Sequence, residues 1–151
     1  MEITNTEKGK LYAFHWRRIK IAMSYEFYLE AISICYDFLE DCTRSILKAR
    51  SSSKALDTMF IKTKLKKIGN IITQRKQILA RYVTVQDIEE TINWLDSRND
   101  LIHRMMKNPR SSEDSKMVAE NGVLIARKFM DISTKFRRAL AKAEAKNGGT
   151  L

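Results

Sequence analysis

Turn-forming residues are scarce in this 151-residue chain, which holds only one proline and five glycines. All-β domains depend on tight turns rich in these two residues, so their scarcity argues against a β-sandwich or barrel. No stretch approaches the roughly 18 apolar residues of a membrane span, and residues 1–20 lack the apolar core of a secretory signal. We therefore expect a helical protein of the cytoplasm that does not enter a membrane.

Cysteine is nearly absent as well, with Cys35 and Cys42 as the only two. They lie seven residues apart in a segment with helical periodicity, which separates their Cα atoms by roughly 10 Å. A disulfide needs these atoms within about 7 Å. The spacing therefore predicts two free, buried thiols, as a reducing cytoplasm favours.

Histidine is equally rare, and no cluster of His, Cys and carboxylate residues has the spacing of metal ligands. The chain also has no glycine-rich phosphate loop, no Ser/His/Asp order and no Cys/His pair suited to nucleophilic catalysis. We expect neither a metal ion nor any other cofactor.

Positive charge predominates in the chain, because 28 lysines and arginines outnumber 18 acidic residues and give a net charge of +10. This balance favours an anionic partner, nucleic acid first and an acidic protein second. Hydrophobic residues make up 44% of the chain, which suffices for one core. Residues 1–151 are accordingly predicted to form a single helical domain.

Apolar residues recur at spacings of three and four, which predicts an all-α fold, an up-down bundle of about four helices. The first helix is expected over about 8–50 and the second from Leu56 onward. Gly69 and Asn70 could end or bend the second helix, so the pattern leaves open whether 55–82 form one helix or two.

A third helix is predicted after Thr84, because Thr84 followed by Asp87 resembles a capping box. It should end before Pro109, and the segment 111–114 offers caps for a last helix. The ordered core is expected over about 8–145, with residues 146–151 frayed. The last helix is predicted to bury a face formed by Val118, Ile125, Phe129, Ile132, Phe136 and Leu140.

The third predicted helix has a polar residue in its apolar stripe. The stripe consists of Ile88, Ile92, Leu95, Ile102 and Met106, and Asn99 occupies its missing position. His103 follows four residues later on the same face. Arg98 lies roughly 140° around the helix from His103, so the two side chains need a long reach, a distorted turn or a second subunit to meet.

A plainer interpretation of this segment is an exposed, charged turn. In that case Asp96 and Asp100 would pair with Arg98 and Arg104, and His103 would be a partly buried filler. Trp94, Met105 and Met106 are interpreted as core or interface residues.

The segment LDSRNDLIHR, residues 95–104, matches a known motif in more than the spacing between its arginine and its histidine. Arg98, Asn99 and His103 resemble the motif of the HEPN superfamily, in which an Arg is followed by a polar residue and, four to six residues on, by a His. The likeness extends over about 8–145 and is sharp only over 95–104. It implies a HEPN-like bundle acting as a metal-independent endoribonuclease, of toxin or phage-defence type, in homodimers whose two motifs share one RNA cleft.

The resemblance makes Arg98 and His103 catalytic and gives Asn99 an orienting or polarising role. Attack by an RNA 2′-hydroxyl on its own phosphate needs proton transfer, for which histidine is suited near neutral pH. It also needs a fixed positive charge at the phosphate oxygens, which arginine supplies. The candidate RNA contacts are Arg104, Lys62 and Lys66.

One position departs from the family pattern, because some toxin members carry a modified tyrosine two residues after the histidine and this chain has Met105. Regulation by tyrosine modification is therefore in doubt, although a cognate antitoxin protein remains an expected partner. The alternative function is a non-catalytic helical module that binds protein or nucleic acid.

Each of two further basic segments is open to two interpretations. Residues 14–18, FHWRR, could stack on RNA, although an amphipathic helix rim is favoured. The lysines of residues 62–67 could follow phosphates or simply form a solvated helix face.

Overall fold

All regular structure in the described part of the chain is helical. A computed structural model describes residues 4–51, 53–74, 76–108 and 114–148. They form five α-helices: α1 (Asn5–Ser24), α2 (Tyr28–Lys48), α3 (Ile61–Ile72), α4 (Val85–Lys107) and α5 (Ser115–Gly148). Two short 3₁₀ turns, η1 (Lys54–Asp57) and η2 (Ile78–Arg81), flank α3. The expected all-helical bundle is confirmed, with one α-helix more than the sequence predicts.

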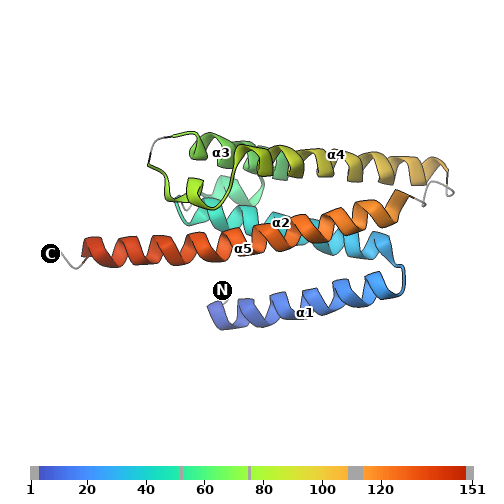
Figure 1. The fold of residues 1–151 in the computed structure, drawn as a ribbon, viewed down its shortest axis with the longest axis horizontal. Coiled ribbons are helices and arrows are strands. Elements are labelled where there is room, and N and C mark those ends of the chain that lie inside the picture. The colour runs from blue at the N-terminus through green and yellow to red at the C-terminus, as the bar shows by residue number, and fades with distance from the viewer. Residues whose placement is uncertain (1–3, 52, 75, 109–113, 149–151) are drawn as a thin grey trace.

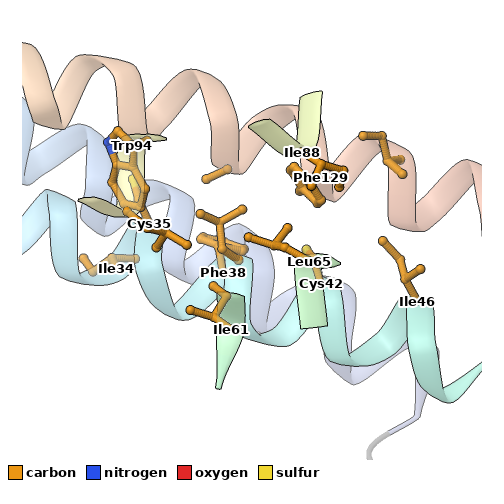
Figure 2. Packing of buried hydrophobic residues seen from close by; sticks show 14 of the residues in the cluster. Ile34, Cys35, Phe38, Cys42, Ile46, Ile61, Leu65, Ile88, Trp94 and Phe129 are labelled. Atoms are coloured by element: carbon orange, nitrogen blue, oxygen red, sulfur yellow. The ribbon is translucent and has the colours of Figure 1, made fainter. Parts of the chain in front are cut away.

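Helices α2 and α5 form the centre of the bundle and make its largest contact (Figure 1). Helix α1 covers α2 on one side, while α3 and α4 pack on the other side. Side chains from α2, α3, α4 and α5 meet between these helices, among them Phe38, Leu65, Trp94 and Phe129 (Figure 2). The core therefore depends on segments far apart in the sequence.

The single helix expected over 8–50 is wrong, because the chain turns between α1 and α2. Glu26 adopts a left-handed backbone conformation with φ of 60°. Its N–H donates to the Met23 carbonyl at 3.2 Å, and the Phe27 N–H donates to the Ala22 carbonyl at 2.8 Å. These two bonds are the pair that closes a Schellman motif, in which glycine usually occupies the left-handed position. A glutamate there gives no sequence signal of a helix end.

The helix ends differ from expectation by a few residues. A capping box between Thr4 and Glu7 starts α1 before residue 8. The sequence leaves open whether residues 55–82 form one helix or two, and their described part contains a single α-helix between two 3₁₀ turns. Helix α5 continues through Gly148, past residue 146 where fraying is expected to begin, and the expected caps at 111–113 lie outside the described residues.

Both cysteines are free and fully buried, as predicted. Burial raises the pKa of each thiol to about 12. Cys35 and Cys42 are therefore protonated packing residues of α2 at neutral pH. On the last helix the predicted inner face is largely correct, since Val118, Phe129, Ile132 and Phe136 are buried. Ile125 and Leu140 are half-buried.

Helices α4 and α5 approach closely at Gly122, where a β-carbon would lie 2.6 Å from a ring carbon of Trp94. Trp94 cannot move aside freely, because it is buried and its indole N–H donates to the Val118 carbonyl at 2.8 Å. Overpacking a core costs about 1–3 kcal/mol, against a gain of about 1 kcal/mol in helix propensity for alanine. We expect Gly122→Ala to lower the free energy of unfolding by up to about 2 kcal/mol in urea denaturation.

Gly9→Ala is the matched control, since a β-carbon at Gly9 on α1 meets nothing within 4 Å. Helix propensity alone then predicts an increase of up to about 1 kcal/mol in the free energy of unfolding. Equal effects of the two substitutions would contradict the close approach of Trp94 and Gly122.

None of the described helices contains an apolar stretch long enough to cross a membrane.

Candidate functional site

Helix α4 carries the predicted motif, and a confirmed capping box fixes where it begins. The Thr84 N–H donates to the Asp87 carboxylate at 2.9 Å, and the Asp87 N–H donates to the Thr84 hydroxyl at 3.1 Å. Lys128 of α5 also pairs with Asp87. The start of α4 is thus tied to α5 by charge as well as by packing.

Asp87 makes the stability of this helix start depend on pH. Burial acts to raise the pKa of its carboxyl, but the bonds from Lys128 and Thr84 outweigh burial and hold it below its ordinary value. A lowered pKa in the folded state means that the stabilisation is complete above about pH 4 and is lost as the pH falls through the folded-state value. We expect the melting temperature of Asp87→Asn to change less between pH 6 and pH 3 than that of the wild type. Equal changes in both proteins would show that Asp87 contributes nothing to the acid sensitivity.

The predicted stripe of α4 is correct at Ile88 and Leu95, which are buried, but further along the helix the buried face lies about one residue away from it. Thr91, Trp94 and Leu101 are buried, whereas Met106 is 84% exposed. Asn99 is also exposed, so its predicted place in a buried stripe is wrong. Its neighbour Arg98 lies instead between the buried residues Leu95 and Leu101 of α4.

Arg98 is half-buried and reaches from α4 to α2. Its guanidinium lies over the Tyr36 ring, 4.2 Å from the ring centroid, and its Nη1 donates to the Asn99 side-chain oxygen at 3.0 Å. The Nε atom of Arg98 is buried and has no hydrogen-bond partner among the residues that the structure describes. The guanidinium group is therefore held between an aromatic face and an amide, and its remaining N–H groups can still donate hydrogen bonds.

Tyr36 is a site residue that the sequence analysis missed. Burial raises the pKa of its hydroxyl, and the nearby Glu40 raises it further, while the charge of Arg98 opposes this shift. The periodicity of α2 shows only that Tyr36 lies on a face with other apolar residues. Its contact with a residue 62 positions later depends on how α2 and α4 pack.

His103 is exposed on the last turns of α4, as is Asn99. Among the described residues, no hydrogen bond or ion pair joins His103 to Arg98 or Asn99. Five residues of ideal helix place Arg98 and His103 roughly 140° apart. One chain therefore brings Arg98 and Asn99 together and leaves His103 facing solvent on its own.

Two of the three candidate RNA contacts are already in ion pairs. Arg104 pairs with Asp114 at 2.9 Å, and Lys62 pairs with Asp96 across the α3–α4 contact. The interpretation as an exposed, charged turn, in which the charges of this segment pair with one another, is thus wrong for Arg104 and Asp96, since both pair with residues outside the segment. Lys66 is exposed.

The other two basic segments each place some of their residues in packing contacts. Lys64 is buried, with its ammonium group 2.6 Å from the Glu40 carboxylate, so it does not join the exposed lysines of α3. His15 and Trp16 face Phe38 of α2, with ring centroids 6.1 and 5.1 Å away, although Phe14 is 47% exposed. In the segment 14–18, His15 and Trp16 therefore contribute to the contact between α1 and α2, and the remaining residues are exposed.

Nowhere in the described ranges do three His, Cys, Asp or Glu side chains gather as they would around a metal ion. Comparisons with protein-family models, curated proteins and solved structures found no match to this chain. The residues of α4 and their surroundings are therefore the basis on which a class of protein can be proposed.

Proposed function

We propose that the chain is a metal-independent endoribonuclease of HEPN type, acting in the cytoplasm as a homodimer. The observation that carries the proposal is the arrangement on the second half of α4. Arg98 is held against Asn99 and Tyr36, and His103 is exposed one turn beyond Asn99. Arg98, Asn99 and His103 are the three residues that the HEPN-like motif makes functional.

Each residue has a defined task in the proposed reaction. His103 takes the proton from the 2′-hydroxyl or gives one to the leaving 5′-oxygen. Arg98, oriented by Asn99 and Tyr36, stabilises the negative charge that develops on the phosphate. The products are a 2′,3′-cyclic phosphate and a 5′-hydroxyl.

The divergence of Arg98 and His103 within one chain is the reason for proposing a dimer. A second copy packed near the end of α4 supplies its own His103 and Arg98, so that the groups of two chains surround one RNA phosphate. Met106, 84% exposed next to these residues, is an apolar side chain that such a contact would cover. Arg104, Lys62 and Lys66 are then the flanking RNA contacts.

Cleavage of a labelled single-stranded RNA in excess EDTA tests the proposal, together with the molar mass from light scattering. We expect cleavage and twice the chain mass of 17.6 kDa. A monomer that cleaves would contradict the shared site. A stable dimer that leaves every RNA tested intact would instead favour the non-catalytic binding module.

A further inference from the structure

A basic groove lies at the other end of the molecule from His103. It has a volume of about 700 Å³ and runs between η2 and the C-terminal half of α5. Its charged rim consists of Arg81, Lys135, Arg138, Lys142 and Lys146. Asp114, which binds Arg104 near the end of α4, directly precedes α5. The distance along α5 therefore gives the separation between the end of α4 and the groove. At 1.5 Å per residue, the groove lies roughly 30–46 Å along α5 from the end of α4.

Most of this charge is not neutralised by the protein. Lys135 pairs with Asp131 at 2.8 Å, whereas Arg81, Arg138, Lys142 and Lys146 have no ion pair with any described residue. None of the residues lining the groove is acidic. Four cations that repel one another in a shared concave surface favour an anionic occupant.

The arrangement suits a chain of regularly spaced negative charges. Lys135, Arg138, Lys142 and Lys146 follow at steps of three, four and four residues, so they form one stripe about 16 Å long on α5. Ala139 and Ala143 lie between them, and small side chains there let a ligand backbone approach the helix. Tyr82, half-buried at the groove, offers an aromatic ring on which a base can stack.

We propose that this groove binds the phosphodiester backbone of single-stranded nucleic acid. An acidic peptide would satisfy the charges, but it has no use for the aromatic ring beside them. The groove is a binding site separate from the α4 motif, and the proposal holds whether or not the chain cleaves RNA.

Fluorescence anisotropy on the full chain tests the groove directly. Labelled 20-nucleotide oligouridylate and oligothymidylate are titrated at several salt concentrations, with His103→Ala as the background so that RNA stays intact. Each phosphate contact on a single strand contributes about 0.7 to the slope of log affinity against log salt. We expect Arg138→Gln/Lys142→Gln to reduce this slope by about 1.4 and to weaken binding.

The matched control is Lys10→Gln/Lys54→Gln, which removes the same charge from two exposed positions on α1 and η1. Its slope should stay close to that of the background protein. Equal losses in both variants, or no binding of either oligonucleotide, would overturn the proposal. Oligoglutamate of the same length binding as tightly as the oligonucleotides would also overturn it, in favour of an acidic protein partner. Binding of both oligonucleotides or of RNA alone supports it and identifies the source of the phosphates.

Discussion

Replacing His103 by alanine is expected to lower the rate of RNA cleavage by about 10²–10⁴-fold, the contribution of a positioned proton-transfer group. The loss follows from the proposed chemistry, in which His103, the only histidine of α4, carries out the proton transfer. The side chain is exposed, so the free energy of unfolding should change by less than about 0.5 kcal/mol. The measurement compares single-turnover cleavage rates and urea denaturation for the two proteins.

Lys107→Ala provides the control, since Lys107 is also exposed on the last turn of α4. It should keep a cleavage rate near that of the wild type. Arg98→Lys keeps the charge but loses the planar fork of donors, so its rate should fall even though the fold is retained. Wild-type rates in His103→Ala would remove this residue from the mechanism.

The second large effect concerns the pair formed by Lys64 and Glu40. Lys64 has only 2% of its side chain exposed, and Glu40 of α2 is its charged partner at 2.6 Å. Removing one member of a buried pair leaves an uncompensated charge and costs about 3–5 kcal/mol. We expect Glu40→Ala to lower the free energy of unfolding by about 3 kcal/mol, at the low end because Glu40 is partly exposed.

The double variant Lys64→Met/Glu40→Leu separates charge from packing. Well-packed apolar residues often replace a buried ion pair without loss, so its stability should lie close to that of the wild type. If Glu40→Ala and the double variant were equally destabilised, lost packing rather than the unpaired charge would be the cause. If Glu40→Ala were fully stable, the burial of Lys64 would be in error.

Features that depend on neighbours in the sequence were predictable. The capping box at Thr84 and Asp87, the end of α4 before Pro109 and the inner face of α5 all follow from local periodicity and capping chemistry. The free cysteines follow from helix geometry alone. In each case the outcome depends on residues within a few turns of one another.

Features decided by tertiary packing were not predictable in the same way. The apolar residues of α4 fit two neighbouring stripes, one through Asn99 and one through Arg98, and packing against the other helices selects the second. The burial of Lys64 likewise depends on Glu40, 24 residues earlier. The turn at Glu26 escapes prediction for a local reason, because a glutamate occupies a position that glycine usually marks.

The central claim, cleavage of RNA by its own 2′-hydroxyl without a metal ion, is tested most directly at the product ends. An RNA with a mapped cleavage site is compared in excess EDTA with the same RNA carrying a single 2′-O-methyl group at that site, and the products are weighed by mass spectrometry. The account predicts a 2′,3′-cyclic phosphate and a 5′-hydroxyl from the first RNA and no cleavage of the second at that site. Cleavage of the methylated RNA there, or products ending in a 5′-phosphate, would contradict it.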